Sequence, residues 1–107
     1  MATPIPPTSH KITLEEGVDL TTRYRESKQE ARTPTLVFNR EAFDRILKQP
    51  GCVAVRLYPC LHADGKQNVV VVGVDEKGSD MTQGELSQIA MECPPICDPD
   101  SALMGAK

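Results

Sequence analysis

The sequence predicts a small single-domain α+β fold, in which helix, strand, helix and hairpin follow one another around a mostly antiparallel three-stranded sheet. Three observations predict this class. A capped amphipathic segment spans 40–49, two apolar segments at 52–58 and 68–74 flank an Asp64-Gly65 turn, and 107 residues suffice for one core. The core is expected to be aliphatic, because the chain contains no Trp, two Tyr and two Phe.

The chain divides into three expected parts. Residues 1–11 contain Pro4, Pro6 and Pro7 and are expected to form a flexible N-terminal arm, because proline does not fit a helix interior. Residues 12–92 are expected to form the α+β domain. Residues 93–107, which contain two cysteines and several prolines, are expected to form an irregular C-terminal tail.

The first expected helix spans 14–28. Thr13 and Glu16 have the spacing of a capping box, in which each residue satisfies a backbone N–H of the other. Gly17 lowers the helical propensity of this segment. After Pro34, the alternating residues 35–38 are expected to form a short strand.

The second helix, 40–49, has the strongest signals in the chain. Asn39 is expected to cap it, and Phe38 and Phe43 occupy the two positions of a hydrophobic staple around that cap. Pro50 and Gly51 end it. Its apolar stripe consists of Ala42, Phe43, Ile46 and Leu47.

The hairpin that follows must be covered by other parts of the protein. The returning strand, 68–74, is apolar on both faces, and an isolated hairpin is marginal in water. We therefore expect a third strand beside it, supplied by 35–38 or by a second copy of the protein. Thr82 and Glu85 are expected to cap a further short helix over 86–90.

A self-association surface is the first candidate functional site, because the chain is too short to cover both faces of this strand. Arg56 and Tyr58 lie on one face of the preceding strand, and a half-buried Arg needs a carboxylate or carbonyl partner. Arg56 is interpreted either as an edge charge that opposes aggregation or as a contact for a partner or an anion. The predicted interface consists of Val69, Val70, Val71, Val72, Val74, Arg56 and Tyr58.

The cysteines are the second candidate site. Cys93 and Cys97, with Cys60, could bind zinc or an iron–sulfur cluster or carry thiol redox chemistry, since thiolates serve all three. Cys52 and Cys60 would lie ~26 Å apart on a continuous strand, unless the chain bends at Pro59. Two prolines between Cys93 and Cys97 favour a polyproline path of ~12 Å, beyond disulfide reach, although a turn could bring the sulfurs together. Buried apolar cysteines are the simpler interpretation of Cys52 and Cys60.

Other motifs are weak. His10 and His62 are not accompanied by a triad, the acidic residues of 64–80 lack EF-hand spacing, and the glycines form no phosphate-binding loop. No catalytic residue or cofactor is therefore assigned.

Composition bears on partners and compartment. The net charge of −3 is spread along the chain and disfavours nucleic-acid binding. The sequence shows neither a signal peptide nor an apolar run of membrane-spanning length, so a cytoplasmic protein with reduced thiols is expected.

Two resemblances are visible. The order of helix, Arg-bearing strand and cysteines resembles that of A-type iron–sulfur carriers, but that family's glycine-rich segment and terminal CGC are missing, so no residue role is transferred. The segments Phe-Asn-Arg-Glu-Ala-Phe, Ile-Leu-Lys-Gln-Pro-Gly-Cys-Val and Val-Gly-Val-Asp-Glu-Lys-Gly-Ser-Asp, with the final Cys-Pro-Pro-Ile-Cys, are similar to a family of small uncharacterised bacterial proteins. This second resemblance implies one compact domain and no particular activity.

The sequence thus predicts a non-enzymatic interaction or assembly module that forms a homo-oligomer through 69–74. The alternative is a metal, iron–sulfur or thiol redox protein that uses the C-terminal cysteines. A third hypothesis is that 93–107 is a linear segment recognised by another protein.

Overall fold

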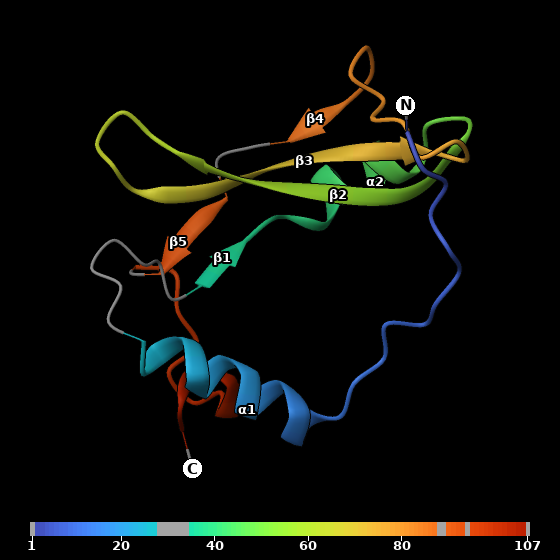
Figure 1. The fold of residues 1–107 in the computed structure, drawn as a ribbon. Coiled ribbons are helices and arrows are strands. Elements are labelled where there is room, and N and C mark those ends of the chain that lie inside the picture. The colour runs from blue at the N-terminus through green and yellow to red at the C-terminus, as the bar shows by residue number, and fades with distance from the viewer. Residues whose placement is uncertain (1, 28–34, 88–89, 94, 107) are drawn as a thin grey trace.

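The computed structural model describes residues 2–27, 35–87, 90–93 and 95–106, and within them the chain is a small α+β domain (Figure 1). In the view of Figure 1, one α-helix lies at the bottom of the molecule, and the other lies behind the strands at the top. The elements are α1 (Leu14–Arg25), β1 (Thr35–Val37), α2 (Arg40–Leu47), β2 (Cys52–Leu61), β3 (Gln67–Asp75), β4 (Leu86–Ser87), β5 (Met91–Cys93) and the 3-10 helix η1 (Ala102–Met104).

The strands form two antiparallel sheets, so the prediction of one three-stranded sheet was wrong. One sheet has the order β2-β3-β4, and the other consists of β1 and β5. The expected neighbour of β3, segment 35–38, pairs with β5 instead, with Thr35 opposite Cys93 and Val37 opposite Met91. The strand β4 occupies the place beside β3, where Leu86 lies opposite Val72.

The hairpin of β2 and β3 is the largest unit and was predicted in type and position. Its register pairs Leu57 with Val71 and Arg56 with Val72. Gly65 has φ +86 and donates its N–H to the His62 carbonyl, a conformation that favours glycine. The pairing shifts between Cys52 and Ala54, where β2 contains one extra residue.

The helix α2 covers one face of this hairpin. Phe38 and Phe43 meet edge to face, with their ring centroids 5.5 Å apart, which confirms the predicted staple. Asn39 is the N-cap residue of α2, as predicted, although its side chain makes no capping hydrogen bond. Ile46 is completely buried, and its Cγ2 would lie 3.3 Å from a Cβ added to Gly73. The glycine thus allows α2 to approach β3 closely.

The predicted helix over 86–90 is replaced by β4 in the described residues. The expected cap fails because the Glu85 N–H donates to Oε1 of Gln49, at 2.8 Å, across the molecule. The side-chain amide of Gln49 in turn donates to the Ile46 carbonyl at the end of α2. Gln49 therefore anchors Glu85, where the chain leaves the turn at 81–84 and enters β4. Residues 88–89 lie outside the described residues.

The helix α1 begins with the predicted capping box. Glu16 N–H donates to Oγ1 of Thr13 at 3.1 Å, and Thr13 N–H donates to Oε1 of Glu16 at 3.0 Å. The helix ends at Arg25, and the expected continuation to Lys28 falls outside the described residues. The hydrogen bond from the Thr13 backbone, followed by the one from its side chain, holds the pKa of Glu16 below its usual value of 4.5.

This lowered pKa predicts an acid-sensitive helix start. A carboxyl group whose folded pKa is depressed stabilises the folded state above its unfolded pKa, and this contribution is lost as pH falls through the folded value. We expect the helicity of α1, followed by NMR chemical shifts, to decrease over that acidic range. Glu16→Gln should remove this dependence while the neighbouring variant Glu15→Gln keeps it; an unchanged profile in Glu16→Gln would contradict the assignment.

The C-terminal segment is more ordered than the irregular tail that the sequence predicted. Cys93 belongs to β5 and forms a disulfide with Cys97, with a Cα–Cα distance of 5.0 Å. Beyond it, η1 packs on α1, below the two sheets (Figure 1). At the other end of the chain, a Cβ on Gly78 would collide with the Thr3 carbonyl, so the start of the arm lies against the turn after β3.

Candidate functional site

The predicted interface valines are mostly inside the monomer. Val71, Val72 and Val74 are 0%, 2% and 1% exposed, while Val69 and Val70 are half-buried. Val71 is buried because α2 lies over the face of the hairpin that contains Val71 and Gly73, whereas Val72 and Val74, on the other face, have neighbours on both sides of the central strand β3. Val71, Val72 and Val74 therefore belong to the core of the monomer, and a self-association surface would have to use other parts of the sheet.

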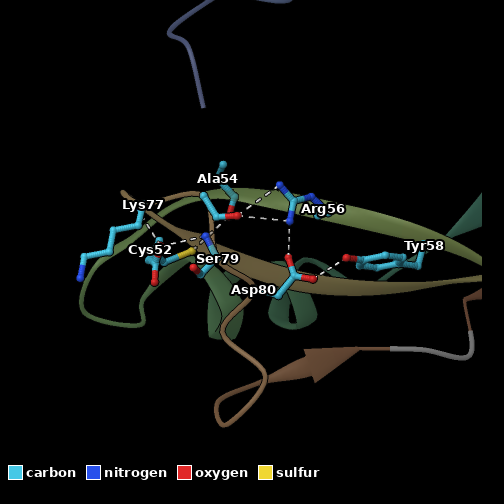
Figure 2. A network of polar contacts seen from close by, with 9 residues as sticks. Cys52, Ala54, Arg56, Tyr58, Lys77, Ser79 and Asp80 are labelled. Carbon is cyan, nitrogen blue, oxygen red and sulfur yellow. Dashed lines mark hydrogen bonds and ion pairs between the residues drawn. The ribbon is translucent and has the colours of Figure 1, made fainter. Parts of the chain in front are cut away.

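A polar cluster occupies the other face of the hairpin. Arg56 Nη1 lies 2.6 Å from Oδ1 of Asp80, and the Tyr58 hydroxyl donates to the second oxygen of the same carboxylate. Figure 2 shows both side chains pointing from β2 toward Asp80, which the bridge between Val74 and Asp80 places beside β3. Arg56 also contacts the Gly78 carbonyl at 3.4 Å. The predicted need of Arg56 for a carboxylate or carbonyl partner is thus confirmed.

The surroundings of Arg56 favour the positively charged form of its side chain. The pKa of Arg56 is raised by a side-chain hydrogen bond with Tyr58 and, against the opposing effect of burial, by the charge of Asp80. Because Asp80 engages both Arg56 and Tyr58, the cluster anchors the turn after β3 to the hairpin. The structure thus brings the two predicted site residues Arg56 and Tyr58 together, but their shared partner is the carboxylate of Asp80 in the same chain.

The strand β2 is at an edge of its sheet. At the end of the hairpin, His62 N–H donates to the Lys66 carbonyl, at 2.9 Å. Backbone groups alternate in direction along an antiparallel strand, so residues 54, 56, 58 and 60 bond toward β3 and residues 55, 57, 59 and 61 point away from it. Pro59 belongs to the outward set, which explains why β2 passes through it unbroken. No strand of the described chain pairs with this outward edge.

Exposed apolar side chains accompany this edge. Leu57 and Leu61 are 51% and 69% exposed and lie on the same face of β2, and Val53, at the extra residue, is also exposed. Natural edge strands are usually protected by charges, short length or a covering element. Among the residues that the structure describes, Pro59 and the side chain of Arg56 are the protective features of β2 between 54 and 61.

The cysteines separate into a bonded pair and two thiols. Cys93 and Cys97 form the disulfide, so a turn brings their sulfurs together and the polyproline path between them is not taken. Cys52 and Cys60 are free and half-buried at opposite ends of the continuous strand β2. Among the described residues, no group of three or more His, Cys, Asp or Glu side chains gathers where it could hold a metal ion. Cys60 therefore does not join the tail cysteines in such a group.

The two ends of the disulfide have different surroundings. Cys93 is 3% exposed in β5, whereas Cys97 is exposed and lines a cavity of about 360 Å³ between β1 and the C-terminal segment. Apolar side chains form much of its wall, among them Leu36, Ile96 and Met104. Cys60 instead lines a separate cavity of about 440 Å³ near Tyr24 and Leu36.

Asn68 is a structural residue that sequence reasoning missed. It is 2% exposed, donates from Nδ2 to the Ala90 carbonyl and accepts the Ala90 N–H on Oδ1, both at 3.1 Å. The side chain of Asn68 thus ties the backbone of Ala90, one residue before β5, to β3. The sequence does contain a signal for this role, because Asn68 places an amide side chain in an otherwise apolar strand.

The described part of the chain contains no helix long and apolar enough to cross a membrane. Comparisons with protein-family models, with curated proteins and with solved structures gave no match.

Proposed function

We propose that this protein is a non-enzymatic interaction module that self-associates through the outward edge of β2. The observation that carries this proposal is a ten-residue strand whose outward edge is paired by no other strand of the described chain and carries exposed leucines. The proposal keeps the self-association inferred from the sequence and moves it from β3 to β2.

Backbone chemistry supports a second copy as the occupant of this edge. The outward N–H and C=O groups of Val55, Leu57 and Leu61 can form an antiparallel ladder with the same strand of another molecule. Such a pair has two-fold symmetry, so each copy presents the same surface and the assembly closes at two subunits.

Side-chain chemistry favours a register centred on Tyr58. In that register the two Tyr58 rings are opposite each other, Val55 faces Leu61 of the second copy, and Leu57 faces Pro59. Cross-strand apolar and aromatic pairs of this kind stabilise a sheet by roughly 0.2–1 kcal/mol each. A register centred on Arg56 would instead oppose two cations, which is unfavourable.

Introduction of positive charge at the exposed edge tests the proposal. We expect the wild-type protein to form a dimer in native mass spectrometry and in a dilution series by light scattering, and Leu57→Lys/Leu61→Lys to be monomeric with an unchanged fold. Both leucines are exposed in the monomer, so their substitution should affect association much more than stability.

A matched control is available on the second sheet. Val37 is also exposed, on β1, and Val37→Lys should leave the dimer intact. Val71→Lys is unsuitable as a test because it places a charge in the core and should unfold the protein. A monomeric wild type at all concentrations, or a dimer that persists in Leu57→Lys/Leu61→Lys, would refute the proposal.

A further inference from the structure

We propose that Cys93 and Cys97 form a reversible redox site, which reacts with small dithiols and whose reduction releases α1 and η1 from the rest of the fold. The inference concerns the C-terminal segment and does not depend on self-association through β2. It rests on three features: the accessibility of one sulfur, the path of the chain around the disulfide, and the contacts that hold α1.

The different exposure of the two cysteines decides which sulfur a dithiol attacks. A thiolate of the dithiol reaches the sulfur of exposed Cys97, forms a mixed disulfide with it and releases the thiolate of buried Cys93. The second thiol of the reductant then displaces Cys97. The dithiol is oxidised to its cyclic disulfide, and its two electrons and two protons leave both cysteines as thiols.

The path of the chain explains why reduction would move the tail. The disulfide holds the Cα atoms of Cys93 and Cys97 5.0 Å apart. The intervening Pro94-Pro95 sequence favours an extended polyproline path, on which four steps would span ~12 Å. In the oxidised chain one backbone hydrogen bond, from Ile96 N–H to the Glu92 carbonyl at 3.0 Å, accompanies the reversal. After reduction the covalent link is gone, and this hydrogen bond is left to oppose extension of the chain between Cys93 and Cys97.

The contacts of α1 make the tail its main support. Among the helices and strands that the structure describes, α1 packs chiefly against η1. Arg25 Nη1 donates to the Leu103 carbonyl at 2.7 Å, and Leu103 also approaches the buried Gly17. In Figure 1 the C-terminal segment runs from β5 down to α1, at the opposite end of the view from β4. The end of α1 also reaches the sheet, because Tyr24 lines a cavity with Cys60 of β2 and Val69 of β3. Displacement of η1 would therefore release α1 as well.

The surface uncovered by this release is apolar. The cavity beside Cys97 lies between β1 and the C-terminal segment, and Leu36, Val37, Leu103 and Met104 are among its lining residues. Separation of the two sides would expose the half-buried Leu36 and Met104 more fully, next to Val37 and Leu103, which are already exposed. In a reducing compartment, where structural disulfides are uncommon, the site would alternate between the two states according to the thiol poise.

The experiment compares oxidised and reduced full-length protein by intact mass and by hydrogen exchange. Reduction with excess dithiothreitol under native conditions should add about 2 Da, for two hydrogens, and make Cys93 and Cys97 reactive toward iodoacetamide. Amide exchange should become roughly tenfold faster in 14–25 and 101–106, while 40–47 in α2 should be unchanged. Reoxidation should reverse both changes.

Two double variants make the result specific. Cys93→Ser/Cys97→Ser should show the fast exchange of α1 without reductant. Cys52→Ser/Cys60→Ser lacks both free thiols and should respond to dithiothreitol as the wild type does. A disulfide that resists excess dithiol, or α1 exchange that is the same in both redox states, would overturn the proposal. Equal acceleration of amide exchange in α1 and α2 would overturn it too, because the disulfide would then stabilise the whole fold rather than α1 and η1 in particular.

Discussion

Asn68→Ala is expected to lower the free energy of unfolding by about 3 kcal/mol, because it leaves buried backbone groups without partners. The Asn68 amide bonds the N–H and C=O of Ala90, and its oxygen also accepts the Val69 N–H at 2.8 Å. An unsatisfied buried polar group costs roughly 1–3 kcal/mol, and three groups are affected. This loss is a large part of the roughly 5–15 kcal/mol that stabilise a typical domain.

The measurement is urea unfolding, with hydrogen exchange to locate the effect. Asn39→Ala is a matched control, because Asn39 is exposed and makes no capping bond, and it should change stability by less than about 0.5 kcal/mol. Exchange in Asn68→Ala should rise first around Ala90 and β5, where the chain passes between the two sheets. An effect no larger than that of Asn39→Ala would show that Asn68 does not join the sheets.

Ile46→Ala is expected to cost about 3 kcal/mol as well, through a cavity beneath α2 rather than through polar groups. Ile46 is 0% exposed and packs over Gly73, at the point where α2 approaches β3. Truncation of a buried Ile to Ala typically costs roughly 2–5 kcal/mol, and truncation to Val roughly 0.5–1.5 kcal/mol. Thermal unfolding should therefore shift downward by roughly 10–20 °C in Ile46→Ala and by much less in Ile46→Val.

The neighbouring residue provides the control for this prediction. Leu47 belongs to the same apolar stripe but is 52% exposed, so Leu47→Ala should cost less than about 1 kcal/mol. Equal losses in Ile46→Ala and Leu47→Ala would mean that α2 presents a different face to the sheet. The stripe read from the sequence contains both residues and does not distinguish them.

Local interactions explain which elements could be predicted. The Thr13–Glu16 capping box, the Phe38–Phe43 staple and the Asp64-Gly65 turn each act over a few residues, and all three are present in the structure. For the same reason the helix starts at Leu14 and Arg40 were predicted correctly. Asn39 likewise occupies the predicted N-cap position of α2, although its side chain makes no capping hydrogen bond.

The candidate sites depended on distant pairings and were predicted less well. Arg56 was singled out, but its partner Asp80 is 24 residues away and two turns separate them. Val71, Val72 and Val74 were assigned to an interface because the sequence did not show that β4 would pair beside β3 or that α2 would pack on the hairpin. Cys93 and Cys97 were recognised as a pair, while their bonded geometry depends on a turn that the prolines alone do not favour.

The sequence by itself determined the α+β class, the hairpin, the two helix starts and the aliphatic core, since each follows from periodicity or from contacts within a turn. Only the tertiary structure decided that β1 pairs with β5, that 86–87 is a strand, and that β2 carries the outward edge. The physical reason is that these choices depend on side chains far apart in the chain. Gln49 diverts Glu85 from a helix cap, and Asn68 marks where the chain passes to the second sheet.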